Sequence, residues 1–196
     1  MRAPTFKGKI EQTMFYGLAS FSEKPEVSFK DQEDGEVALL LLRKHFVTNV
    51  PWLAALALLL LTPVAFLLSP YREIFPFLPI LPVRFLFFIG AGWYLASTIF
   101  FLISFSGWFF NINLVTNKRI LDVDYWGFLY FNVAETPLTN IQDITYSISG
   151  LSQTFFNYGT VQIQTAGTAA NFEFALIPNP AAAHDLITDV MRGKHA

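Results

Sequence analysis

The chain has 196 residues and a formal net charge of −2, with 14% charged residues, 17% aromatic residues and no cysteine. Soluble domains carry about 25% charged residues, so the deficit of charge and the 22 phenylalanines favour a protein in contact with lipid. The weakly acidic balance excludes a nucleic-acid binder, and the lack of cysteine excludes disulfide scaffolds, thiol nucleophiles and thiolate metal sites.

The N-terminal part divides into two segments. Residues 1–35 show no periodic apolar pattern, and we expect this arm to be mobile. The acidic segment DQEDGE, residues 31–36, lacks the spacing of a calcium loop and predicts a solvated turn. Residues 36–46, EVALLLLRKHF, form an apolar run that ends in basic side chains. This run predicts a helix that lies along the membrane interface and leads into a membrane span.

Two charge-free segments, residues 46–68 and 85–110, are long enough to cross a bilayer as transmembrane helices. Pro63 lies inside the first segment and predicts a bend, because its missing N–H leaves a carbonyl one turn earlier without its helical donor. The segment between the two spans is rich in proline and predicts a turn rather than a third helix. Trp52 and Trp108 lie near the span ends, as interfacial tryptophans do.

Basic residues flank the predicted spans unequally, and Lys and Arg close to a span favour the cytoplasmic side. Those outside the hairpin are Lys30, Arg43, Lys44, Lys118 and Arg119, and those in the turn are Arg72 and Arg84. We therefore expect an integral protein of the cytoplasmic membrane with both termini in the cytoplasm. His45 is interpreted as a further interfacial anchor, and a pH-sensitive contact is the alternative.

After Phe110 the pattern changes to short segments rich in β-branched and aromatic residues, separated by turn residues. The segments are NINLVT, RILDVDYW, FLYFNV, NIQDITYSIS, TVQIQT and FEFALI. Such spacing predicts an antiparallel sheet or barrel within residues 111–196. Asn179 and Pro180 are typical of a helix N-terminus, and an apolar stripe follows them. We therefore expect a membrane α-helical hairpin plus a mainly-β barrel or sandwich closed by a C-terminal helix.

Several of these segments resemble a known family when taken together and in order. VTNKRILDVDYWG, PLTNIQDITYSISG, FNYGTVQIQTAG and FEFALIPNP are similar to the bacterial pleckstrin-homology-like (PH-like) domain of the YdbS-like membrane proteins. The resemblance covers residues 36–192. It implies a PH-like fold of two roughly orthogonal sheets with a C-terminal helix, preceded by one or two membrane helices, and no established catalytic activity.

Asp122 and Asp124 are the clearest pair of groups for chemistry. Carboxylates two residues apart on a strand share a face and can approach one hard cation. No third ligand or Gly-rich phosphate loop accompanies them, so a solvated strand face is the preferred interpretation. We expect no catalytic residue, no metal and no cofactor. Residues 111–196 carry four basic and seven acidic side chains, which argues against specific recognition of anionic headgroups.

The segment GLSQTFFNYG, residues 150–159, is the candidate interaction site because it carries Phe155, Phe156 and Tyr158. These rings either plug the end of the barrel, or remain exposed and contact lipid or another chain. Gly127 and Gly159 are predicted to turn with positive φ.

The leading functional hypothesis is a non-enzymatic, membrane-anchored scaffold at the cytoplasmic face, which binds a protein partner or assembles with copies of itself. Two alternatives stay open. One is a membrane-surface metal-dependent enzyme that uses Asp122 and Asp124. The other is an accessory subunit of a transport or secretion complex.

Overall fold

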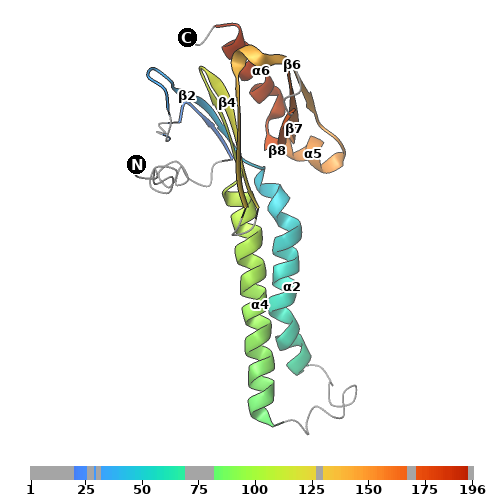
Figure 1. The fold of residues 1–196 in the computed structure, drawn as a ribbon. Coiled ribbons are helices and arrows are strands. Elements are labelled where there is room, and N and C mark those ends of the chain that lie inside the picture. Colours follow the sequence, from blue (N-terminus) through green and yellow to red (C-terminus); the bar gives the residue numbers. More distant parts are fainter. Residues whose placement is uncertain are drawn as a thin grey trace, which may run out of the picture. The chain divides into compact units, whose positions relative to one another are not determined.

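The computed structural model describes residues 20–25, 29, 32–68, 82–126, 130–166 and 171–193. The chain forms two compact units, whose helices and strands are drawn in Figure 1. The helical unit consists of Asn49–Ser106, and the β unit combines the chain up to Thr48 with Gly107–Ala196. The helical unit is therefore an insertion within the sequence of the β unit.

The helical unit is built on α2 (Val50–Leu68) and α4 (Val83–Phe109). The two helices contact each other through Trp52 and Phe101, whose ring centroids lie 6.1 Å apart. Phe46–Asn49, at the start of the predicted first span, forms the short 3-10 helix η1 and leads directly into α2. By length and composition, Phe46–Phe66 and Val83–Phe109 are apolar enough to cross a membrane. The Pro-rich turn predicted between them lies outside the described residues, apart from its last few positions.

α2 continues through Pro63, and a contact from α4 explains how. A proline inside a helix leaves the carbonyl four residues earlier without its usual N–H donor, which here is the carbonyl of Leu59. The indole Nε1–H of Trp93 donates to this oxygen at 2.7 Å. A side chain of the neighbouring helix thus replaces the lost backbone hydrogen bond, as a helix in an apolar environment requires.

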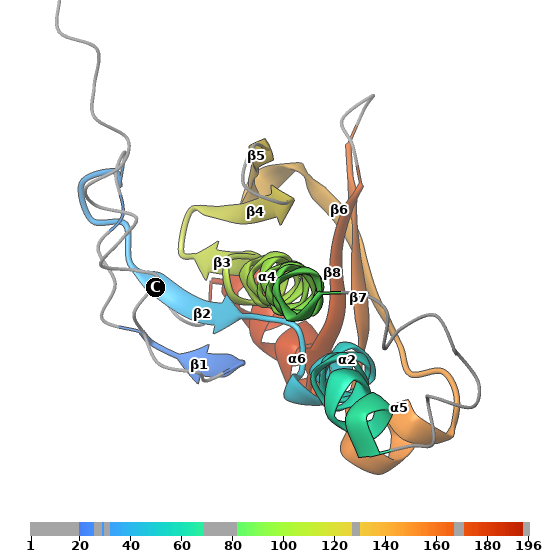
Figure 2. The same cartoon turned by 90° about the horizontal axis from the view of Figure 1, so that it is seen from below.

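The β unit contains two antiparallel sheets, one of five strands and one of three (Figure 2). In the first the strand order is β1 (Phe21–Glu23), β2 (Ala38–Leu42), β3 (Ile112–Thr116), β4 (Arg119–Trp126) and β5 (Tyr130–Pro137). In the second the order is β6 (Ile141–Ser147), β7 (Tyr158–Thr165) and β8 (Phe172–Pro178). The sheets do not close into the barrel that the strand spacing predicted, whereas the two-sheet arrangement agrees with a sandwich.

Three predicted segments of the β unit are corrected by the structure. Residues 36–46 do not form an interfacial helix, because Ala38–Leu42 is strand β2, which lies between β1 and β3 in the large sheet. Within the arm predicted to be mobile, Phe21–Glu23 pairs with β2 as strand β1. The β domain, predicted within residues 111–196, therefore begins before the helices. Residues 1–19, 26–28, 30 and 31 lie outside the described part of the chain.

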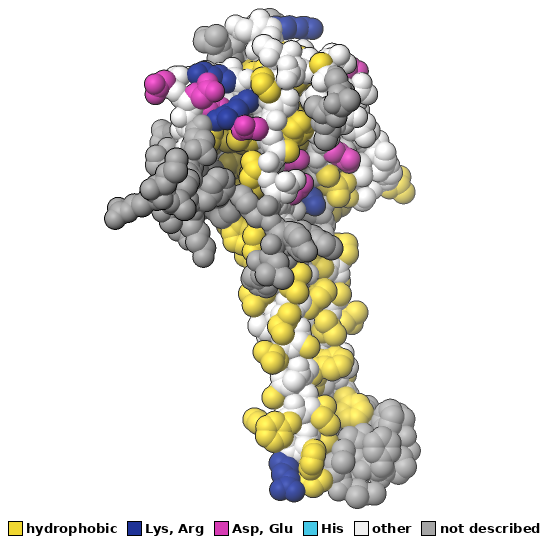
Figure 3. Space-filling view, viewed as in Figure 1, with side chains coloured by type: hydrophobic (Ala, Val, Ile, Leu, Met, Phe, Trp, Pro, Cys, Tyr) yellow, Lys and Arg dark blue, Asp and Glu magenta, His cyan; other side chains and the backbone are white. Residues whose placement is uncertain are grey.

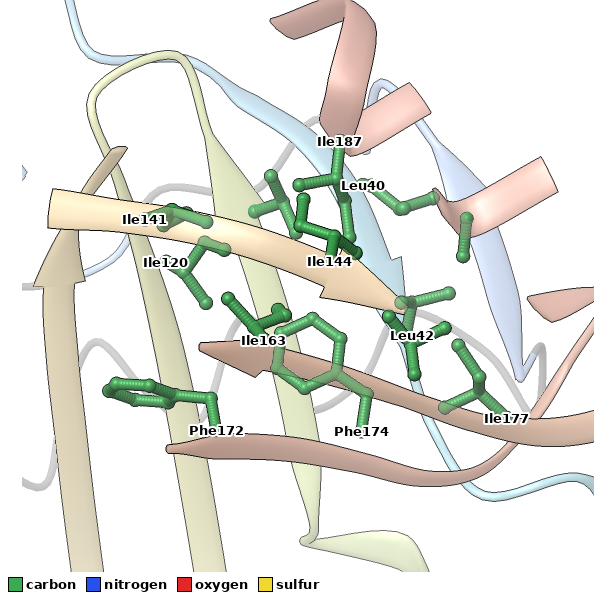
Figure 4. Close-up of a cluster of buried hydrophobic side chains, with 13 residues drawn as sticks. Leu40, Leu42, Ile120, Ile141, Ile144, Ile163, Phe172, Phe174, Ile177 and Ile187 are labelled. Atoms are coloured by element: carbon green, nitrogen blue, oxygen red, sulfur yellow. The ribbon is translucent and has the colours of Figure 1, made fainter. Parts of the chain in front are cut away.

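The core of the β unit lies between the two sheets and α6 (Pro180–Met191), and its side chains are drawn in Figure 4. Leu40 and Leu42 of β2 project into it beside Ile120 of β4. Phe174 of β8 and Ile187 of α6 pack against them and are fully buried. Each of these strands and the helix supplies apolar surface to one core, so removal of β2 would leave that core open.

The predicted start of the C-terminal helix is confirmed. Asn179 is the N-cap residue, its side chain accepts from the N–H of Ala182, and Pro180 follows at the first helical position.

The prediction for Gly159 was wrong, because this residue lies in β7 without the positive φ that we predicted. A Cβ at Gly159 would collide with the carbonyl oxygen of Ser147 and would crowd Ile148 and Pro180. Gly127 lies outside the described residues.

Candidate interaction surface

An exposed apolar surface lies on α5 (Leu151–Phe156), a short helix between β6 and β7. Leu151 is 92% exposed, Phe155 82% and Phe156 46%. The rings of Phe155 and Phe156 meet edge to face with their centroids 4.9 Å apart. Together with Ser152 and Thr154, these three apolar residues line a shallow, open hollow. We call Leu151, Phe155 and Phe156 the α5 patch.

Tyr158, the third aromatic residue of the predicted site, is not part of the α5 patch. It is only 8% exposed and its ring stacks on that of His45, with centroids 5.1 Å apart and planes 13° apart. Its hydroxyl lies 3.1 Å from Oγ of Ser152 in α5. Tyr158 therefore positions α5 and is not available as a contact residue.

His45 connects this region to the start of the helical insertion. Its backbone N–H donates to the carbonyl of Leu176 in β8 at 2.7 Å, and its ring Nδ1 accepts from the N–H of Val47 at 3.1 Å. Partial burial lowers the pKa of His45 from its ordinary value, because burial disfavours the charged imidazolium. An accepting Nδ1 is compatible with the neutral ring, so His45 is a structural link rather than an exposed anchor.

Arg43 and Lys44 connect the two ends of the helical insertion within the β unit. Arg43 is fully buried, its guanidinium lies 4.8 Å from the centre of the Phe109 ring, and burial lowers its pKa. The carbonyl of Lys44 accepts from Nε1–H of Trp108 at 2.9 Å. Trp108 is itself buried, so it does not belong to an interfacial belt of aromatic residues.

Lys118 and Arg119 do not lie beside the end of α4, where the membrane-flanking prediction placed them. Lys118 lies in the turn from β3 to β4 and Arg119 is the first residue of β4, and β3 separates them from α4 by roughly 17 Å of extended chain. Lys118 pairs with Glu33 at 2.9 Å, and Arg119 pairs with Glu36 at 3.0 Å and with Glu135 at 2.8 Å. These two cations are part of a charge network that joins the β3–β4 turn to the segment before β2.

Asp122 and Asp124 share one face of β4, as the alternation predicted, but their environments differ. Asp122 lies on the face of Ile120 and opposite Asn113 and Ala134, whereas Asp124 is exposed. Burial, and secondly the charge of Asp124, raise the pKa of Asp122 to about 7, although the charge of Lys44 opposes this. Among the described residues no group of three His, Asp or Glu side chains is arranged to hold a metal. The structure gives the metal-dependent enzyme hypothesis no additional ligand.

We expect Asp122→Asn to stabilise the protein by about 2 kcal/mol at pH 8, a figure that allows for the partial exposure of the carboxyl. Because the pKa of this carboxyl is raised in the folded state, the carboxyl does not lower the free energy of unfolding below about pH 4. Between about pH 4 and pH 7 it destabilises the fold increasingly. The variant should therefore lose this decline in stability between pH 4 and pH 7. Thermal unfolding of the full chain in detergent micelles across this range measures the effect.

The exposed Asp124→Asn is the control for this substitution, and we expect its own direct effect on stability to be small. If Asp122→Asn instead destabilised the protein at pH 8, the carboxylate would be making a favourable contact, such as one to a cation, and our assignment would be wrong.

Sequence reasoning missed two residues that organise this region. Leu151 shares a helix face with Phe155 four residues later and is the most exposed residue of the α5 patch, but six residues are too few for a detectable helical period. Glu36 was interpreted as part of a solvated turn and is instead buried. Its carboxylate accepts from Thr116 and Arg119, residues too distant in sequence to be identified as partners.

The assignment to a family rests on the strands on both sides of the helices. Residues 36–191, from Glu36 to the end of α6, match the family described as Bacterial PH domain. The chain belongs to this family. The bacterial PH domain thus includes β2 as well as the strands that follow α4, in agreement with the composition of the β unit.

One solved structure is similar to a part of this bacterial PH domain protein. It is a duf1696 family protein with a pleckstrin-homology domain from Shewanella loihica, at 15% sequence identity. The similarity covers 41% of this chain and 70% of that chain, with a TM-score of 0.34. No curated protein matches the chain.

Proposed function

We propose that this bacterial PH domain protein is a membrane-anchored scaffold, in which α2 and α4 span the cytoplasmic membrane and hold the PH domain at the cytoplasmic face. The domain binds a protein partner or a second copy of the chain. The observation that carries the proposal is the insertion of two long apolar helices between two paired strands of one folded domain.

The apolar surface of the helices supports anchoring in a bilayer. Large hydrophobic side chains remain exposed along both helices, for example Leu58 and Leu61 of α2 and Phe87, Phe88 and Leu95 of α4. Figure 3 shows hydrophobic side chains along the whole length of the helical part, with Lys or Arg only at its lower end in this view. Exposed apolar surface of this extent is unfavourable in water and favourable in lipid.

The pairing of β2 with β3 supports a hairpin whose two ends lie on the same side of the membrane. β2 ends eight residues before α2 begins, β3 begins three residues after α4 ends, and Leu42 of β2 lies opposite Asn113 of β3. A hairpin that leaves and re-enters one sheet at neighbouring strands must return to the side of the membrane from which it started. The excess of Lys and Arg outside the hairpin favours the cytoplasm as that side.

Exposed apolar side chains of the domain support binding of a partner protein. Besides the α5 patch, the domain exposes Val37, Tyr146 and Ile148, and exposed apolar groups are typical of interaction surfaces. An accessory subunit of a transport or secretion complex is the same proposal with a different protein partner.

A reporter fused after Ala196 tests the orientation in intact cells. We expect activity from a reporter that works only in the cytoplasm, and we expect protease added to spheroplasts to leave the PH domain intact. Digestion of the domain from outside, or release of the protein from membranes by alkaline extraction, would contradict the proposal.

A further inference from the structure

The α5 patch brings three exposed apolar side chains together on one short helix. Leu151 and Phe155 lie four residues apart on one face of the helix and are nearly fully exposed, with Phe156 beside them. The segment from Gly150 to Asn157 contains no charged side chain. Leu and Phe on the exposed face of a helix are side chains that insert at the boundary between headgroups and acyl chains.

The contacts of α5 restrict its position along the chain. Ser152 contacts Tyr158, whose ring stacks on that of His45. The backbone N–H of His45 donates a hydrogen bond to the carbonyl of Leu176 in β8. α2 begins at Val50, five residues after His45, so the covalent chain keeps the start of α2 within about 18 Å of His45. Phe46, the residue after His45, is also exposed. The α5 patch therefore belongs to the end of the domain from which the chain departs to form α2.

We infer that the α5 patch inserts into the interface of the bilayer that α2 and α4 span, and so fixes the PH domain against the membrane surface. This inference rests on the proposed function, because the helices must bring the domain to a bilayer. Because α2 begins only five residues after His45, this short tether gives the patch a high effective concentration at the lipid surface. A diffusing protein partner would have to compete with the lipid for the patch. The uncharged patch requires no anionic lipid.

The chain contains no native cysteine, so single nitroxide labels can measure depth in the bilayer. The full chain is reconstituted into phosphatidylcholine vesicles with a label on Thr154→Cys, a position on α5 that leaves the patch intact. Labels on Leu60→Cys in α2 and on the exposed Gln162→Cys in β7 provide the deep and aqueous references. Collisions of each label with oxygen and with a water-soluble nickel complex report its depth.

We expect position 154 to lie at headgroup depth and position 60 near the bilayer centre. Adding Phe155→Ser and Phe156→Ser should shift the label at 154 to the accessibility measured at 162. The matched control, Val37→Ser with Met191→Ser, removes two exposed apolar side chains from other elements and should leave the label at 154 in place.

The outcomes separate the inference from the proposed function. A deep label at 60 with an aqueous label at 154 overturns the inference alone, and leaves the α5 patch to a protein partner or to solvent. An aqueous label at 60 overturns the proposed function and the inference with it. Insertion that requires phosphatidylglycerol, or that is lost in high salt, would indicate a site for anionic headgroups and would also contradict the inference.

Discussion

Replacing Arg119 with methionine is expected to lower the free energy of unfolding at pH 7 by about 3 kcal/mol. The side chain of Glu36 is fully buried, and its carboxylate accepts from Nε of Arg119 at 3.0 Å and from Nη2 at 3.1 Å. Methionine keeps much of the apolar stem but removes the cation, so the carboxylate would be left buried without its counter-ion. Chemical unfolding of the full chain in detergent micelles measures the loss.

Lys118→Met is the control, because its ion pair with Glu33 is exposed and should contribute less than about 1 kcal/mol. Burial opposes ionisation of Glu36, but hydrogen bonds from Arg119, Glu33 and Thr116 and the charge of Arg119 outweigh it and lower the pKa. A lowered pKa stabilises the fold above the pKa of the unfolded carboxyl, and the stabilisation is lost as the pH falls through the folded value. The difference between Arg119→Met and the parent should therefore shrink in acid, and equal losses from both variants would contradict the assignment.

Gly159→Val is expected to destabilise the β unit by about 3 kcal/mol or more, because a new side chain has no space in the folded state. Its Cβ alone would overlap the carbonyl oxygen of Ser147, a backbone atom that cannot move without disturbing the pairing of β6 and β7. Cγ1 of Ile148 and Cγ of Pro180 close the space from other directions at 3.1 Å and 3.2 Å. The thermal midpoint of the full chain measures the loss.

Gly107→Ala is the matched control, since a Cβ at this helical glycine meets nothing within 4 Å. Alanine is favoured over glycine inside a helix by about 1 kcal/mol, so this variant should be neutral or more stable. If Gly159→Val unfolded at the temperature of the parent, the close approach of the two strands would be refuted.

The local signals that predicted the elements correctly differ from those that failed. RILDVDYW alternates in polarity and lies between turns, and it forms β4 with the predicted bounds. The Asn179–Pro180 pair specifies a helix start through atoms only three residues apart. In both cases the information is contained in the segment itself.

β2 was mistaken for a helix because its environment is decided by distant residues. A strand buried on both faces has a continuous apolar sequence, and such a run is not distinguished from a helix by periodicity. Leu40 and Leu42 face the main core, while Ala38 and Leu41 belong to a second buried cluster on the opposite face. That β2 is a strand becomes evident only from its pairing with β3, which the whole helical insertion separates from β2 in the sequence.

The same long-range relation limited the site prediction. Tyr158 is buried against His45, more than a hundred residues earlier in the chain, whereas Phe155 and Phe156 remain exposed. Lys118 and Arg119 are close to α4 in sequence, but the intervening strand carries them away from it. A fragment of residues 111–196 would lack β1 and β2, so stability is tested on the full chain.

The central claim, that one domain on one side of the membrane is assembled from both sides of a spanning hairpin, is tested most directly by thiol accessibility. Single cysteines replace three exposed residues: Val37 before the hairpin, Gln162 after it, and Val83 at the start of α4. In spheroplasts treated with an impermeant maleimide, the account predicts labelling at 83, and at 37 and 162 only after the membrane is permeabilised. Labelling of 37 and 162 from opposite sides, or of all three from the same side, would contradict it.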